Sequence, residues 1–283
     1  GSAKWIHEHC LEQWRRTGAR KDAAYRCGQC RDEYRDALSL ELLSARLQAE
    51  RTDGQATNFT LGTLAEELRV LGKYDEAEPL YREALEVARE TLGNRHERTL
   101  ISINNFGLLL QDKGDFAAAE PLYREALEAR RETLGNRHPH TLASINNLSA
   151  LLQDKGDFAV AEPLCREALE ARRETLGNRH RHTLDSINNL GALLQSTGDF
   201  AAGEPLCREA VKVRRETLGS RHPYTLGSIN NLGSLLCDKG DLAAAELLLR
   251  EALEGMREVL GNQHPTTLIV TNNLARCVAE GQG

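Results

Sequence analysis

Apolar and small residues recur along residues 57–283 at the spacing of amphipathic helices. Within residues 183–196 they fall at i, i+3, i+4 and i+7, which places them on one face of a helix. A Gly198-Asp199 pair interrupts this stripe, and a second stripe continues to Gly219, a residue type suited to the left-handed end of a helix. The pattern therefore predicts two consecutive helices joined by a short turn.

This pair of stripes repeats every 42 residues. The segment T-L-x-x-x-N-N-[FL] begins at Thr99, Thr141, Thr183, Thr225 and Thr267. A weaker copy begins at Thr57, which gives five units and a half unit at 57–98, 99–140, 141–182, 183–224, 225–266 and 267–283. Because one helix pair cannot close a core alone, each pair must pack on its neighbours, and the repeat predicts an all-α solenoid.

The repeat resembles the tetratricopeptide repeat, specifically the 42-residue variety of kinesin light chains. The motifs that carry this resemblance are N-N-L-G, G-D-F, A-E-P-L, R-E-A-L and L-G-x-R-H-P. The resemblance implies a right-handed α-solenoid whose concave groove binds extended peptide segments, and hence a scaffold for protein-protein interaction. A kinesin-light-chain-like cargo adaptor is an alternative, although no heptad coiled coil precedes the repeats in this sequence.

Two sets of asparagines in the first helix of each unit are expected to differ in role. Helical geometry places Asn188 away from the core stripe, and the resemblance implies that this position lines the groove. The expected peptide-binding residues are Asn104, Asn146, Asn188, Asn230 and Asn272, with Gln111, Gln153 and Gln195. The alternative for this set is a solvated or self-paired surface. The adjacent set is expected to bond across to the neighbouring unit, and consists of Asn105, Asn147, Asn189, Asn231 and Asn273.

Charge and hydropathy disfavour several classes of protein. The net charge of -6 disfavours nucleic-acid binding, which depends on Lys and Arg neutralising phosphates. The apolar runs, such as residues 106–110, are far shorter than the roughly 18 residues that cross a bilayer, so no membrane partner is expected. No signal-peptide pattern stands at the N-terminus, and the seven cysteines form no even framework, so we expect a cytoplasmic location.

Residues 1–34 carry a different pattern, the spacing H-x2-C-x16-C-x2-C. Imidazole and thiolate groups at such separations suit tetrahedral zinc, and the candidate ligands are His7, Cys10, Cys27 and Cys30. Together with Trp14 and Tyr34, they make this segment resemble the C-terminal half of a RING-CH zinc domain, with a plant-homeodomain finger as the runner-up. Residues 35–56 are expected to form a helix that caps the first repeat, followed by a linker.

The RING-CH resemblance implies a ubiquitin-protein ligase as an alternative function. In that case the repeats would recruit a substrate and the zinc domain a ubiquitin-conjugating enzyme. A complete RING-CH domain has four further ligands, so we expect at most a partial zinc site. Because the chain begins with Gly1 rather than Met, it is either a fragment of a longer protein or carries a Gly-Ser remnant of cloning. The sequence holds no Ser-His-Asp arrangement, phosphate loop or repeated pair of acids that would itself indicate an enzyme.

Three other repeated features are interpreted as structural. The loop histidines, one per repeat, are expected to support the linkers. The paired arginines near the ends of the second helices are expected to form a solvated face, and the alternative is that one arginine of each pair reaches an acidic ligand. Cys165 and Cys207 are expected in the core, since they replace Tyr81 and Tyr123 at a packing position. The histidines are His96, His138, His180, His222 and His264, and the arginine pairs are Arg130-Arg131, Arg172-Arg173 and Arg214-Arg215.

Overall fold

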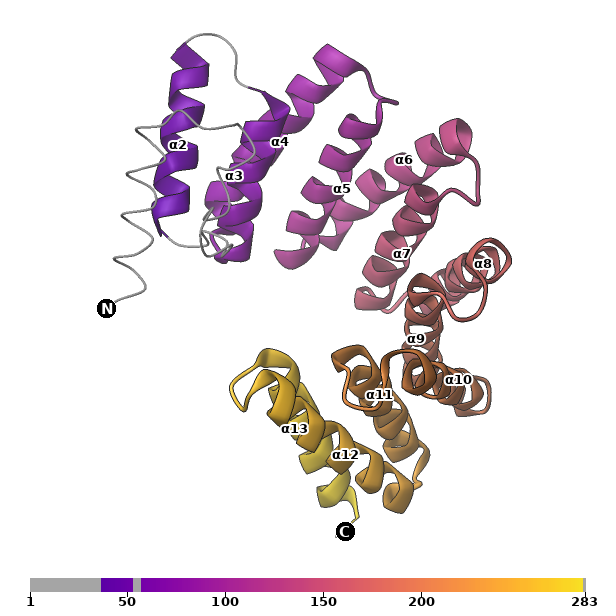
Figure 1. Cartoon of the computed structure of the whole chain (residues 1–283). Coiled ribbons are helices and arrows are strands. Elements are labelled where there is room, and N and C mark those ends of the chain that lie inside the picture. Colours follow the sequence, from indigo (N-terminus) through magenta and orange to yellow (C-terminus); the bar gives the residue numbers. More distant parts are fainter. Residues whose placement is uncertain (1–36, 53–56, 282–283) are drawn as a thin grey trace. The chain divides into compact units, whose positions relative to one another are not determined.

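The computed structural model describes residues 37–52 and 57–281, and every regular element in these ranges is an α-helix (Figure 1). The prediction of an all-α chain built from helix pairs is confirmed for this part of the molecule. None of the described helices is long and apolar enough to cross a membrane. The helices are α2 (Ala37–Thr52), α3 (Asn58–Val70), α4 (Tyr74–Leu92), α5 (Glu97–Asp112), α6 (Phe116–Leu134), α7 (Pro139–Asp154), α8 (Phe158–Leu176), α9 (Arg181–Ser196), α10 (Phe200–Leu218), α11 (Pro223–Lys239), α12 (Leu242–Leu260) and α13 (Pro265–Glu280).

The loop histidines begin the first helices of the repeats. In α9, His180 has an extended backbone at the N-cap position, and its Nδ1 accepts a hydrogen bond of 3.2 Å from the backbone N–H of His182. The same bond recurs at His96, His138, His222 and His264. It satisfies one of the amides that a helix start leaves without an intrahelical partner, so these histidines are helix caps.

Each second helix ends at a glycine that holds the linker in place. At the end of α8, Gly177 adopts a φ of 81°, a conformation that L-amino acids with a Cβ rarely adopt. The carbonyl of Gly177 then accepts a 2.8 Å hydrogen bond from Oγ1 of Thr183, which is fully buried at the start of the next repeat. The repeated Gly and Thr of the sequence signature thus fix the turn between one helix pair and the next.

The chain divides into two compact units, residues 1–122 and residues 123–283. In the first unit α2 packs on α3, α3 on α4, and α4 on α5. Leu43 and Leu47 of α2 are buried, and Glu50 accepts a 3.1 Å hydrogen bond from Thr60 of α3. A second polar tie is the 2.6 Å hydrogen bond that Tyr81 of α4 donates to Glu66 of α3.

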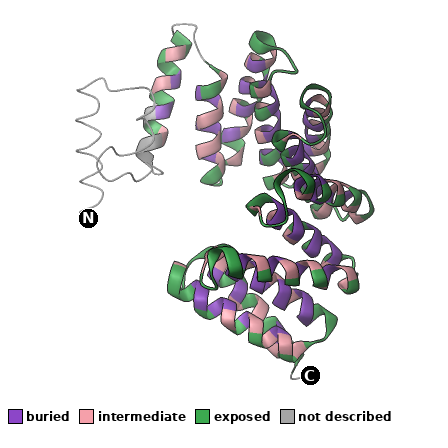
Figure 2. Ribbon diagram, turned by 45° about the vertical axis from the view of Figure 1, so that its right-hand side comes forward, coloured by how far each residue is buried: buried purple, intermediate pink, exposed green. Residues whose placement is uncertain are grey.

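In the second unit each helix from α7 to α13 packs on the next one along the chain, and the first helices α9, α11 and α13 also contact one another in sequence. Their buried residues lie on the sides that face neighbouring helices (Figure 2). Close approach depends on small residues: a Cβ added at Gly191 would lie 2.7 Å from Sγ of Cys207, and one at Gly233 would lie 2.8 Å from Cγ of Leu249. The glycines of the N-N-L-G motif therefore admit a larger side chain from the second helix.

Candidate partner-binding site

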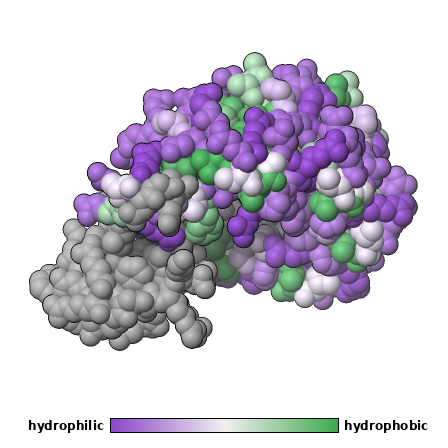
Figure 3. Space-filling view, turned by 90° about the horizontal axis from the view of Figure 1, so that it is seen from above, coloured by the Kyte–Doolittle hydropathy of each residue, from purple (hydrophilic) through white to green (hydrophobic). Residues whose placement is uncertain are grey.

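The first helices of the second unit present a stripe of equivalent positions that are exposed or half-buried. In α7 it contains Ala143, Asn147 and Ala150, all exposed, and in α9 it contains Asp185, Asn189 and Ala192 at the equivalent positions. We call this stripe the first-helix face, and in α11 it continues through the half-buried Gly227, Asn231 and Ser234. Its side chains are small or polar. On the side of the molecule drawn in Figure 3, hydrophobic residues lie in scattered patches on a largely hydrophilic surface.

The asparagines expected to bind peptide are mostly covered. Asn104 and Asn230 are each only 8% exposed, so the prediction that this set is open to solvent is wrong for them. Asn188 is half-buried and exchanges 3.3 Å hydrogen bonds with Ser228 of α11. For Asn188 and Asn230 the physical reason is that the first helix of the next repeat, α11 or α13, covers this side, which helical spacing within one repeat does not reveal. Asn272 of α13 alone in the set is exposed.

The adjacent asparagines occupy the first-helix face instead. Asn147 and Asn189 are exposed and make no side-chain hydrogen bond with the described residues, contrary to the expected contact with a neighbouring unit. Asn273 does make such a contact, because its Nδ2 donates a 3.0 Å hydrogen bond to Oδ1 of Asn230. In the central repeats the contacts within the fold are therefore made by Asn188 rather than by Asn189, and the exposed positions are Asn147 and Asn189.

The glutamines of the predicted site lie at the edge of this face, and all three are half-buried. Nε2 of Gln153 donates a 3.2 Å hydrogen bond to the backbone carbonyl of Ser149 on its own helix. Gln195 instead reaches the next first helix, where it donates to Ser234 at 3.0 Å and to Asp238. Gln111 lies at the same place in α5. These amides serve contacts within the fold in the central repeats.

Three arginines expected at a solvated surface are buried. Arg130, Arg172 and Arg214 are 4%, 7% and 4% exposed. Each donates a hydrogen bond of 2.6 to 2.8 Å to a serine fourteen residues later, on the first helix of the next repeat: Ser144, Ser186 and Ser228. The sequence contains an indication that this position is buried, because it holds apolar residues in two other repeats. These are Ala88 in the first repeat and Met256 in the last complete one.

The second arginine of each pair connects successive second helices. Arg131, Arg173 and Arg215 are partly exposed and pair with a glutamate on the following second helix at 2.6 to 2.7 Å: Glu167, Glu209 and Glu251. Water and salt screen such exposed pairs, so each contributes little to stability. Both members of the arginine pairs are thus occupied within the fold.

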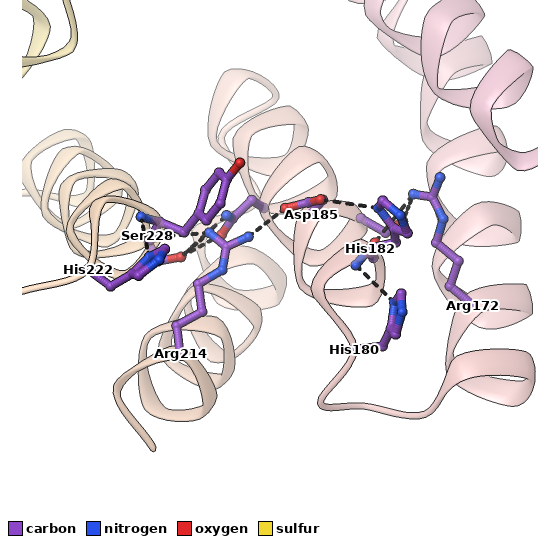
Figure 4. A network of polar contacts seen from close by, with 10 residues as sticks. Arg172, His180, His182, Asp185, Arg214, His222 and Ser228 are labelled. Carbon is purple, nitrogen blue, oxygen red and sulfur yellow. Dashed lines mark hydrogen bonds and ion pairs between the residues drawn. The ribbon is translucent and has the colours of Figure 1, made fainter. Parts of the chain in front are cut away.

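A polar cluster surrounds Arg214 (Figure 4). Its guanidinium donates to Oδ1 of Asp185 at 2.6 Å, to Oγ of Ser228 at 2.8 Å and to the carbonyl of Tyr224 at 3.0 Å. Tyr224 is half-exposed, and its ring lies 5.7 Å from the guanidinium carbons of both Arg214 and Arg181. Burial lowers the pKa of Arg214, while the charge of Asp185 acts in the opposite direction. The carboxylate of Asp185 is therefore a direct counter-ion for a buried cation.

The described residues contain no group of three or more His, Cys, Asp or Glu side chains that could hold a metal ion. The predicted zinc ligands His7, Cys10, Cys27 and Cys30 lie outside the described residues. Cys165 and Cys207 are buried in the core, as predicted, and burial raises the pKa of Cys207 to about 11. A thiol with so high a pKa is a poor nucleophile near neutral pH.

A scan against protein families matches the tetratricopeptide repeat over residues 56–132, 101–174, 140–202, 183–258 and 227–283. The chain belongs to the tetratricopeptide repeat family. The matched segments begin at residue 56, so they do not test the RING-CH resemblance of residues 1–34. No curated protein sequence matches the chain significantly.

Two solved structures have a similar fold. One is from Podosopora anserina, is assigned as a kinesin light chain with nearly identical TPR-like repeats, and is 24% identical over 71% of this chain and 95% of its own, with a TM-score of 0.63. The other is BtubC (BKLC) of P. vanneervenii, 24% identical over 81% of this chain and 94% of its own, with a TM-score of 0.66. With its tandem tetratricopeptide repeats, this chain is a protein-interaction scaffold.

Proposed function

We propose that the scaffold binds an extended peptide segment of its partner along the first-helix face. The observation that carries this proposal is the pair Asn147 and Asn189, which occupy the same position in successive repeats and present amides with no partner in the described fold. An amide offers both a donor and an acceptor, which are the groups that a peptide main chain requires. The small neighbours Ala150 and Ala192 allow a main chain to approach this face closely.

The test measures how tightly two matched double variants bind a peptide. The peptide is selected on the wild-type protein from a random phage library. Replacing Asn147 and Asn189 by Ala should weaken binding by about 1–3 kcal/mol in total, because a neutral hydrogen bond contributes about 0.5–1.5 kcal/mol. Fluorescence anisotropy of the labelled peptide measures this loss, and the melting temperature should stay unchanged. A fully retained affinity would place the binding surface elsewhere.

The control variant replaces Asn146 and Asn188, which lie one residue earlier in each helix and contact the fold. Its melting temperature should fall, while its peptide affinity should change less than that of the first variant. A cargo-adaptor role like that of a kinesin light chain is a narrower form of the same proposal. We place this scaffold in the cytoplasm, on the basis of its sequence alone.

For residues 1–34 we propose a partial zinc site formed by His7, Cys10, Cys27 and Cys30. Its support is the ligand spacing alone, which suits tetrahedral zinc. Elemental analysis of the purified chain should find at most one zinc ion per chain, removed by replacing Cys27 and Cys30 with Ser and kept when the buried Cys165 is replaced. Two zinc ions per chain would contradict a partial site and favour the ubiquitin-ligase alternative with its conjugating-enzyme partner.

A further inference from the structure

Arg172 and Arg214 occupy the same position in successive repeats but have different surroundings. Each lies in a second helix, is at least nine-tenths buried, and donates to a serine and a backbone carbonyl of the following first helix. Only Arg214 has a hydrogen-bonded carboxylate, that of Asp185. The residue equivalent to Asp185 in the preceding repeat is Ala143, which is exposed. The two repeats therefore differ by one counter-ion.

Among the described residues, neutral oxygens alone accept hydrogen bonds from Arg172. Nη1 donates to Oγ of Ser186 at 2.6 Å and to the carbonyl of His182 at 3.4 Å. The Asn146 amide is assigned with its oxygen toward the guanidinium, where Nη1 and Nη2 donate to it at 2.8 and 3.0 Å. Burial lowers the pKa of Arg172, and Asp185 opposes this only through its charge.

The amide oxygen of Asn146 accepts hydrogen bonds from Arg172, whereas a carboxylate accepts them from Arg214. In the next repeat, where Asp185 bonds to Arg214, the equivalent amide of Asn188 turns to Ser228 instead (Figure 4 shows the Asp185–Arg214 contact). The fold thus accommodates both orientations of this amide. A carboxylate that bonds to Arg172 would turn the Asn146 amide toward Ser186. This is the arrangement of the next repeat, where Asp185 bonds to Arg214 and Asn188 bonds to Ser228.

We propose that an Asp or Glu side chain of the bound peptide lies against Ala143. Its carboxylate pairs with Arg172, as the carboxylate of Asp185 pairs with Arg214. This inference rests on the proposed binding of a peptide along the first-helix face. A peptide bound at the exposed Asn147 can reach this position, because Ala143 lies one helical turn earlier in α7. Ala143 has only a methyl group, so it leaves room for the peptide side chain. A guanidinium matches a carboxylate in geometry and forms stronger hydrogen bonds with it than with a neutral amide.

The first experiment places the carboxylate within the chain itself. Ala143→Asp should rebuild the Asp185–Arg214 arrangement with Arg172 and raise the melting temperature by about 2–6 °C. The rise should vanish when Arg172 is replaced by Met, the residue that occupies this repeat position at Met256. Ala150→Asp adds the same charge two turns along α7 and should give no rise. Equal effects of Ala143→Asp with and without Arg172 would overturn the inference.

The second experiment uses a fluorescein-labelled ten-residue peptide of alternating Glu and Ser, with a Gln-Ser peptide as its neutral counterpart. The Glu peptide should bind more tightly than the Gln peptide to the wild-type chain, and Ala143→Asp should weaken it at least about tenfold, as loss of one charge-assisted contact predicts. Ala159→Asp, which adds the same charge at an exposed position of α8 outside the first-helix face, should weaken it far less, because salt screens charges at that distance. Equal weakening by the two variants, or equal binding of the two peptides, would overturn the inference.

The Asn147 and Asn189 double variant separates this inference from the proposed function. If that variant loses the Glu peptide while Ala143→Asp retains it, the first-helix face binds peptides and the carboxylate site above Ala143 is wrong. If both variants retain the peptide at full affinity, the first-helix face itself is not the binding surface, and both proposals fail.

Discussion

Replacing Met256 by Arg should destabilise the C-terminal repeat by about 3–5 kcal/mol, the usual cost of a buried charge without a partner. Met256 is 1% exposed and occupies the repeat position that holds Arg130, Arg172 and Arg214 in the three preceding units. The serine that receives the arginine elsewhere is replaced by Val270, which is fully buried. A guanidinium introduced here would therefore lose its water without the serine hydroxyl and the carboxylate that accept hydrogen bonds from Arg214. Thermal or urea unfolding followed by circular dichroism measures the loss.

Two further substitutions should rescue this variant. Val270→Ser restores the serine fourteen residues after the arginine, and Gly227→Asp adds the counterpart of Asp185. Together they should recover a large part of the lost stability, whereas Val270→Ser in the wild-type chain should itself destabilise, because it leaves a hydroxyl in an apolar core. If Met256→Arg were as stable as the wild type, the serine would not be what allows arginine at this position.

Replacing Gly191 by Leu should separate the helix pair of its own repeat. Even a Cβ would lie 2.7 Å from Sγ of the buried Cys207, so the larger side chain forces α9 and α10 apart. Overpacking of this kind costs about 1–3 kcal/mol, and at this distance we expect the upper part of that range. The melting temperature gives the size of the effect, and hydrogen exchange gives its location.

The matched control is Ala192→Leu, the next residue along α9, which is exposed and should change stability little. For Gly191→Leu, amide exchange should accelerate most in α9 and α10 and less in α12 and α13, because repeats interact mainly with their neighbours. Uniform acceleration across residues 123–281 would instead indicate that this unit unfolds as one cooperative domain.

The sequence by itself determined the repeat, the helix pairs and the residues that end them. The 42-residue period, the glycines with positive φ and the apolar stripes are local properties, and local hydrogen bonds and helical spacing suffice to read them. Cys165 and Cys207 were assigned correctly to the core for the same reason, since the equivalent positions hold tyrosine or leucine. The comparison of equivalent positions was the most informative part of the sequence.

Only the tertiary structure decided which polar residues are buried. Asn188 and Asn189 are neighbours in sequence, and one contacts Ser228 of α11 while the other faces solvent, because the first helix of the next repeat covers only one side of α9. The sequence predicts a solvated face for Arg172 and Arg214, yet each is buried and donates a hydrogen bond to a serine of the following repeat. Burial of a polar group depends on whether a partner from another repeat satisfies it, and helical periodicity within one repeat carries no information about that partner.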